Sequence, residues 1–156
     1  PRPVIRQLMD VFERYQDPVV ALEQVEKHRV GRYGVIDGRR IQSSVYLVRD
    51  FVEKPSPERA PSRLAIAGRY IFTPEIFDHI ARTRKGKQGE IQLTDAMRAM
   101  VRTRAMYGLR FEGVRHDIGN KLDYIKTNVL FGLQRADMRR DLMTFLRDVV
   151  RRPPEV

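Results

Sequence analysis

A carboxylate and an ammonium group are adjacent at Glu53 and Lys54, where a segment rich in β-forming residues, 45–52, meets Pro55. Because proline cannot continue strand pairing, we expect both side chains at the rim of a sheet. A carboxylate there can accept hydrogen bonds from sugar hydroxyls, and the lysine can meet a phosphate as a compact point charge. The pair would suit a sugar phosphate, although Glu-Lys-Pro is also common in plain surface turns.

A glycine lies inside the strand expected before this pair. The pattern over 30–36 predicts a strand that contains Tyr33-Gly34, and Asp37-Gly38 predicts a hairpin turn into the next strand. A glycine within a strand often marks the close approach of a ligand or of another backbone. A β-bulge explains Gly34 equally well from these residues alone.

Apolar residues recur with strand and helix periods along the rest of the chain. The patterns predict further strands over 19–25, 41–52, 65–72 and 106–111, and helices over 4–16, 76–81, 95–101, 122–133 and 142–149. For Thr94 we favour a helix-capping role over a catalytic one. The alternation predicts an α/β fold, with a layered mixed sheet flanked by helices and at least one antiparallel hairpin.

Composition limits the classes of function. The chain has 156 residues, enough for a domain with a core, no cysteine, and a net charge of +10. No apolar run approaches the length of a membrane span, so we expect no membrane segment and a cytoplasmic protein. The charge suits anionic partners, and a basic nucleic-acid-binding module is one alternative. The arginines are scattered and few aromatic residues are placed for base stacking, so nucleic acid is the weaker interpretation.

Several kinds of chemistry lack their sequence signature. The histidines at 28, 79 and 116 are not at metal-ligand spacing, and neither a nucleophile elbow nor a P-loop pattern occurs. What remains is positioning and electrostatic stabilisation, which are the main needs of phosphoryl-type transfer.

Three motifs in the same order resemble the C-terminal half of the bacterial UTP–glucose-1-phosphate uridylyltransferases. They are Val-Glu-Lys-Pro at 52–55, Ala-Pro-Ser-Arg-Leu-Ala-Ile-Ala-Gly-Arg-Tyr at 60–70, and Gly-Glu-Ile-Gln-Leu-Thr-Asp-Ala at 89–96. The resemblance extends from about residue 3 to about residue 133. It implies a nucleotidyltransferase fold, Mg²⁺ as cofactor, and synthesis of UDP-glucose and pyrophosphate from UTP and glucose 1-phosphate. A related nucleotidyltransferase with another base or sugar is the near alternative.

The resemblance also implies roles for single residues. Glu53 would hold sugar hydroxyls, and Lys54 would bind the sugar phosphate and act as the catalytic cation. Gly34 would offer its backbone to the sugar. Ile66 and Ala67 would line the sugar pocket.

The family's second metal carboxylate falls on Asp117, for which a turn or helix cap is the alternative. Here His116 and Ile118 replace the usual neighbours of that aspartate, and Arg63 replaces an uncharged polar residue. We expect none of these departures to break the pocket chemistry.

The family's glycine-rich phosphate loop, base-reading residues and first metal aspartate have no counterpart in this sequence. They would belong to a missing N-terminal half, so we expect the chain alone to be inactive or nearly so. Residues 1–135 are predicted as the sugar-binding half of the nucleotidyltransferase domain, and 136–156 as a C-terminal helix and tail that contact another subunit of a homo-oligomer. Losing half of a sheet predicts an exposed sheet edge.

Overall fold

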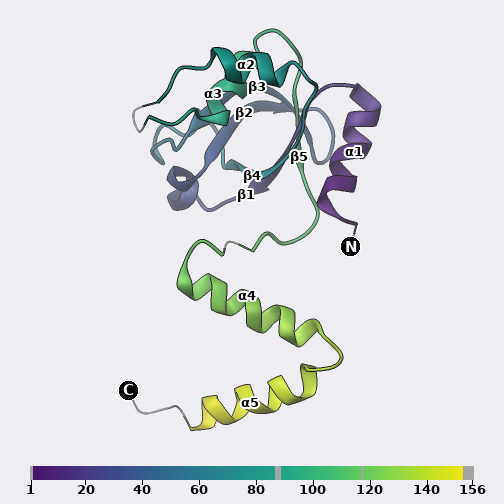
Figure 1. The fold of residues 1–156 in the computed structure, drawn as a ribbon, viewed down its shortest axis with the longest axis vertical. Coiled ribbons are helices and arrows are strands. Elements are labelled where there is room, and N and C mark those ends of the chain that lie inside the picture. The colour runs from purple at the N-terminus through teal and green to yellow at the C-terminus, as the bar shows by residue number, and fades with distance from the viewer. Residues whose placement is uncertain (1, 87–88, 117, 153–156) are drawn as a thin grey trace. The chain divides into compact units, whose positions relative to one another are not determined.

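The computed structural model describes residues 2–86, 89–116 and 118–152, which fall into two compact units, Pro1–Gly113 and Val114–Val156 (Figure 1). The boundary predicted from the sequence, at residue 135, separates the sugar-binding half from the C-terminal helix and tail. It describes function rather than compactness, and it stays a prediction. None of the helices in the described ranges combines the length and the apolar character that a membrane crossing requires.

Within the described residues, five strands of the first unit form a closed barrel in the order β1-β4-β2-β3-β5. They are β1 (Val19–Gln24), β2 (Gly34–Arg40), β3 (Val45–Glu53), β4 (Leu64–Ile71) and β5 (Tyr107–Arg110). β1 pairs antiparallel with β4 and parallel with β5, so the sheet is mixed, as predicted. The prediction of an exposed sheet edge is wrong for these strands, because β5 pairs with β3 as well as with β1 and so closes the barrel.

Three helices cover the barrel from different sides. α1 (Val4–Tyr15) lies on one side, and α2 (Ile76–Arg82) and α3 (Leu93–Met100) lie together on another (Figure 1). α1 ends where Gln16 adopts a left-handed conformation, two residues before Pro18, which cannot continue a helix. These bounds agree closely with the predicted helices.

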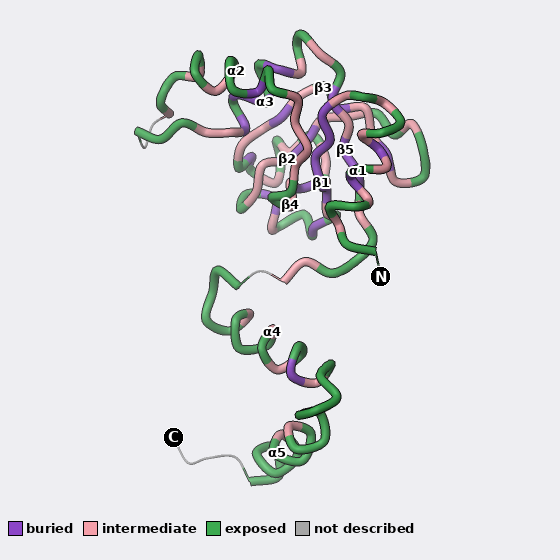
Figure 2. Tube along the Cα trace, turned by 45° about the vertical axis from the view of Figure 1, so that its right-hand side comes forward, coloured by how far each residue is buried: buried purple, intermediate pink, exposed green. Residues whose placement is uncertain are grey.

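The apolar residues of the barrel unit separate into distinct clusters. One cluster lies between the strands and α2–α3 and includes the fully buried Leu22, Ile36 and Phe51. A second lies under α1 around Leu8 and Val19. Figure 2 shows the buried residues following the strands, as expected for sheet faces that are covered by helices.

Two local predictions around residues 30–44 are wrong. Residues Lys27–Arg32 form a 3₁₀ helix, η1, so the strand begins only at Gly34. Asp37-Gly38 is not a turn: it lies within β2 at an irregularity in the pairing with β3, and the chain turns over 41–44. A Cβ on Gly38 would lie 2.9 Å from the carbonyl oxygen of Leu47, so this glycine permits close backbone approach within the ladder.

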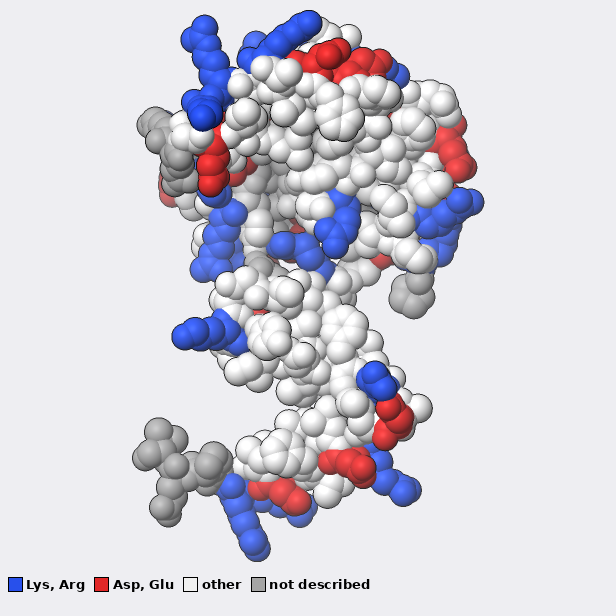
Figure 3. Space-filling model, in the orientation of Figure 1, with Lys and Arg blue, Asp and Glu red and all other residues white. Residues whose placement is uncertain are grey.

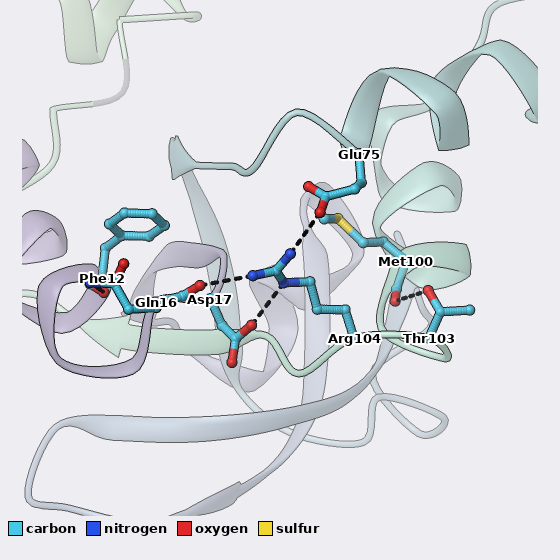
Figure 4. Close-up of polar contacts among 7 residues, drawn as sticks. All are labelled: Phe12, Gln16, Asp17, Glu75, Met100, Thr103 and Arg104. Atoms are coloured by element: carbon cyan, nitrogen blue, oxygen red, sulfur yellow. Dashed lines mark hydrogen bonds and ion pairs between the residues drawn. The ribbon is translucent and has the colours of Figure 1, made fainter.

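A single arginine joins three segments at the base of the helices. Arg104 donates through Nε to Asp17 and through Nη1 to Glu75, both at 2.8 Å, and through Nη2 to the carbonyl oxygen of Gln16 at 2.8 Å (Figure 4). It therefore ties the end of α1 to the start of α2 and to the segment before β5.

The second unit is a pair of helices, α4 (Lys121–Gln134) and α5 (Arg139–Arg151). Asn120 caps α4, with its side chain accepting a hydrogen bond from the amide of Asp123 at 2.9 Å. Gly132 lets α4 approach the side chain of Leu142, since a Cβ there would lie 2.6 Å from Leu142 Cδ2.

Candidate functional site

Side chains from separate elements meet around the end of β3. Gly34 pairs with Glu53 across the β2–β3 ladder. A Cβ placed on Gly34 would lie 2.9 Å from Ile66 Cδ1, 3.0 Å from Glu53 Oε2 and 3.4 Å from Thr94 Oγ1. The structure therefore brings together three of the sequence-predicted residues, Gly34, Glu53 and Ile66, and it leaves no room for a side chain at position 34.

Thr94 was not predicted to belong to this site. Its hydroxyl donates a hydrogen bond of 2.7 Å to Glu53 Oε2, whereas the N-cap of α3 is Gln92. The predicted capping role is therefore wrong, because the helix begins before Thr94 and turns its hydroxyl toward β3. One signal was available: Thr94 precedes Met97 by three residues and so falls on the buried stripe of the helix.

Lys54 follows directly after β3, in a left-handed conformation with φ of 44°. Its amide donates to the carbonyl oxygen of Tyr33 at 3.1 Å. Its Nζ lies 3.9 Å from Glu53 Oε1, which is an ion-pair distance rather than a hydrogen bond. The turn thus keeps an exposed ammonium group beside the free side of the Glu53 carboxylate.

Ile66 and Ala67 face different surroundings. Ile66 packs with the cluster beneath α2–α3, whereas the side chain of Ala67 packs with the cluster beneath α1. Ala67 can therefore contribute only its backbone next to Ile66. The adjacent Gly68 has φ of 67° and lies in an irregular part of the β1–β4 pairing, with open space where a side chain would be.

Tyr70 is a second residue of the site that had no predicted role. Burial raises the pKa of its phenol, and the negative charge of Glu53 adds to this effect. Its ring stacks on Phe72 with a centroid distance of 5.2 Å. Tyr70 also packs against the same apolar cluster as Ile66.

The predicted metal ligand, Asp117, lies outside the described residues. Among the residues that are described, no group of three or more His, Asp or Glu side chains is arranged to hold a metal ion.

The positive charge of the chain is dispersed on the face shown in Figure 3, where Lys and Arg side chains form separate groups with acidic and uncharged surface between them. Several arginines are also paired with acidic side chains. Arg98 binds Asp50 and Arg2 binds Asp10. This arrangement suits a solvated basic surface better than a continuous nucleic-acid groove.

Comparison with known proteins identifies relatives over most of the chain. The profile of the nucleotidyl transferase family matches residues 3–131. A UTP–glucose-1-phosphate uridylyltransferase from Staphylococcus epidermidis is 44% identical over 147 residues, which are 94% of this chain and 51% of that protein. The UTP–glucose-1-phosphate uridylyltransferase YngB of Bacillus subtilis is 43% identical over 150 residues, 96% of this chain and 50% of that protein. The chain thus spans about half the length of the curated relatives it matches.

Solved structures agree with this relationship. A UDP-glucose pyrophosphorylase complexed with UDP-glucose superposes with a TM-score of 0.81 at 40% identity, covering 85% of this chain and 50% of that one. A UTP-bound enzyme from Acinetobacter baumannii superposes with a TM-score of 0.84 at 26% identity, covering 95% of this chain and 51% of that one. The predicted nucleotidyltransferase fold is confirmed. The chain belongs to the nucleotidyl transferase family.

Proposed function

We propose that this chain forms the sugar-phosphate side of a UTP–glucose-1-phosphate uridylyltransferase active site. The observation that carries the proposal is the meeting of Gly34, Glu53, Ile66 and Thr94 at the end of β3. The names of the relatives, which are 40 to 44% identical, support the reaction and the substrates.

In the proposed reaction a phosphate oxygen of glucose 1-phosphate attacks the α-phosphorus of UTP, and pyrophosphate leaves. Glu53 accepts hydrogen bonds from sugar hydroxyls and so orients the sugar. Lys54 neutralises the sugar phosphate, and its ammonium group lies 3.9 Å from Glu53 Oε1. Ile66 supplies an apolar wall, and Gly34, whose missing side chain lets Ile66 and Glu53 approach closely, offers its backbone to the sugar. These groups act by positioning and charge, without a covalent intermediate.

The proposal also covers the binding of the nucleotide and of the metal ion. We assign UTP binding to a nucleotide-binding half that this chain does not contain. Mg²⁺ is the proposed cofactor, with Asp117 as one ligand, and it would neutralise phosphate charge when bound. The proposed location is the cytoplasm.

The second unit is the proposed contact with another subunit, in line with the expected homo-oligomer. Its helices expose Leu122, Ile125, Phe131 and Phe145 by 53 to 62% of their surface. Replacing Phe145 with Ser should shift the chain toward the monomer in sedimentation velocity experiments. An unchanged ratio of monomer to oligomer would show that Phe145 on α5 does not contribute to the interface.

Calorimetric titration with glucose 1-phosphate and with UDP-glucose, in the presence of Mg²⁺, tests the proposed pocket. We expect saturable binding that weakens by about 10- to 100-fold in Glu53→Gln, the loss expected for a hydrogen bond to a charged group. The control Glu13→Gln changes an exposed carboxylate on α1 and should bind like the wild type. Wild-type affinity in Glu53→Gln would show that the Glu53 carboxylate does not take part in binding the ligand.

A second assay decides the case in which the chain alone does not bind. The N-terminal half of the Staphylococcus epidermidis relative is added in trans and pyrophosphate release is measured. Release that depends on Glu53 supports the proposed function. Absence of both binding and release would overturn it.

A further inference from the structure

Helix α3 contacts strand β3 through two polar interactions that lie one helical turn apart. Thr94 donates to Glu53 Oε2 at 2.7 Å. Four residues later, Arg98 donates to both carboxylate oxygens of Asp50, at 2.8 and 2.9 Å. Because residues i and i+4 lie on one face of a helix, both contacts fix the same face of α3 against the same strand.

The second contact is geometrically demanding. Burial acts to raise the pKa of the Asp50 carboxyl, but hydrogen bonds from Arg98 and from the Phe51 amide outweigh it, and the pKa is lowered overall. A two-pronged arginine–carboxylate pair constrains both distance and orientation. Met97 and Met100, both fully buried, pack the same helix into the core and oppose any sliding along β3.

The Thr94 hydroxyl has no other evident use. The residue is 9% exposed, and a buried hydroxyl is costly unless it is hydrogen-bonded. It does not cap α3, whose N-cap is Gln92. Its partner is the Glu53 carboxylate, which lies on a different element and 41 residues away in the sequence.

The two carboxylate oxygens of Glu53 consequently differ in their surroundings. Oε2 accepts from Thr94 and lies 3.0 Å from the position of a Cβ on Gly34, a position that is also 2.9 Å from Ile66 Cδ1. Oε1 lies toward the exposed Lys54 ammonium group. Oε2 is thus engaged by Thr94 beside Gly34, and Oε1, on the side of Lys54, is the oxygen left for an incoming hydroxyl.

We propose that Thr94 is a positioning residue for sugar binding: its hydroxyl holds Oε2 of Glu53 so that Oε1 is presented to a sugar hydroxyl beside Lys54. The proposal rests on the proposed function, because it takes Glu53 to be the sugar-binding carboxylate. It adds a residue that touches Glu53 rather than the substrate.

The test compares Thr94→Val, which keeps the shape and removes the hydroxyl, with Thr94→Ser, which keeps the hydroxyl. Both are titrated with glucose 1-phosphate and UDP-glucose beside the wild type and Glu53→Gln. We expect Thr94→Val to raise the dissociation constants about tenfold and Thr94→Ser to stay within about threefold of the wild type. A purely structural role would instead move the melting temperature, which is measured for every variant; if Thr94→Val does not fold, Thr94→Ala takes its place.

The outcomes separate this proposal from the proposed function. Loss of binding in Glu53→Gln with wild-type affinity in Thr94→Val overturns the positioning role and leaves the sugar site in place. Equal weakening in the Ser and Val variants also overturns it, because the hydroxyl would then be irrelevant. If the wild type neither binds these ligands nor supports pyrophosphate release with the added nucleotide half, the proposed function is overturned. The positioning role of Thr94 is then overturned as well, because it depends on that function.

Discussion

The barrel unit (Pro1–Gly113) and the helical hairpin that α4 and α5 form in the second unit differ in how they bury their apolar residues. In the barrel unit Leu22, Ile36, Phe51 and Met97 are almost completely buried. In the described part of the hairpin, α5 has no buried residue and α4 buries only Gly132. Both units contain amphipathic helices, so the difference lies in what covers the apolar faces. The barrel supplies its own cover, whereas two helices alone have too little surface to cover each other.

This difference indicates where each unit obtains its stability. The closed sheet is covered by α1 on one side and by α2 and α3 on another, and these covers come from the same unit. The hairpin leaves large side chains exposed that a surface helix would normally place against a partner. We therefore expect substitutions of equal size to have unequal effects in the two units.

The largest expected effect comes from the phenylalanine in the barrel core. Phe51→Ala removes a ring that is 1% exposed and should lower the free energy of unfolding by about 3–5 kcal/mol. The matched change Phe145→Ala, at a residue that is 62% exposed, should change the free energy of unfolding of the monomer by less than about 0.5 kcal/mol. Urea denaturation followed by circular dichroism measures both. Similar losses in the two variants would contradict the contrast between the units.

The next effect concerns the glycine at the site. Gly34→Ala places a methyl group against Ile66 and Glu53 and should cost about 1–3 kcal/mol of stability, with loss of sugar-phosphate binding. Gly86→Ala is the control, because a Cβ there would meet its nearest atom at an ordinary 3.5 Å. Thermal melts and calorimetric titration report the two properties separately. An unperturbed Gly34→Ala variant would show that position 34 has more room than the structure indicates.

The sequence anticipated much of this fold because local patterns decide much of it. α1 and β1 have nearly the predicted bounds, and Glu53 lies at a strand end as Pro55 indicated. The turn predicted at Asp37-Gly38 is wrong because these residues pair with β3 despite their strong local preference for a turn. The closing contact of β5 with β3 and the bond from Thr94 to Glu53 join segments far apart in the sequence, which no local pattern encodes.

The grouping of the candidate site residues was predictable mainly through the resemblance. Motif matching proposed Gly34, Glu53 and Ile66 together, and the structure brings them into contact distance. It did not indicate the bond from Thr94 to Glu53, because that bond depends on which way α3 faces. Ala67 directly follows Ile66 in β4, so strand alternation turns its side chain to the opposite face of the sheet.

A smaller effect is expected at the arginine that joins α1, α2 and the segment before β5. Arg104→Lys keeps the charge but cannot reproduce the three-way donation, and it should cost about 1 kcal/mol because the side chain is 32% exposed. Arg102→Lys, at an exposed neighbouring position, is the control. Chemical denaturation at neutral pH detects the difference. A loss in the control as large as that in Arg104→Lys would refute a special role for the three-way contact.

The smallest effect is expected from the Asp50–Arg98 pair, which is 34% and 48% exposed. Arg98→Met should cost about 0.5 kcal/mol at pH 7. Because the folded-state pKa of Asp50 is lowered from its ordinary value of 3.8, the stabilisation is present above that value and is lost as the pH falls through the folded-state pKa. The stability difference between wild type and variant should therefore shrink below about pH 4, as measured by denaturation at several pH values. A difference that persists at lower pH would exclude the Asp50 charge as its source.

The position of β5 in the barrel also has a consequence for synthesis of the chain. β5 lies between β1 and β3, so residues 107–110 complete a ring that starts at residue 19. Among the described strands, β1 and β3 each keep an unpaired edge in the barrel until β5 has been added. Ring closure over such a long sequence separation is slow compared with local helix formation. Until β5 is in place, the edges of β1 and β3 that it covers are open to pairing with strands of other chains.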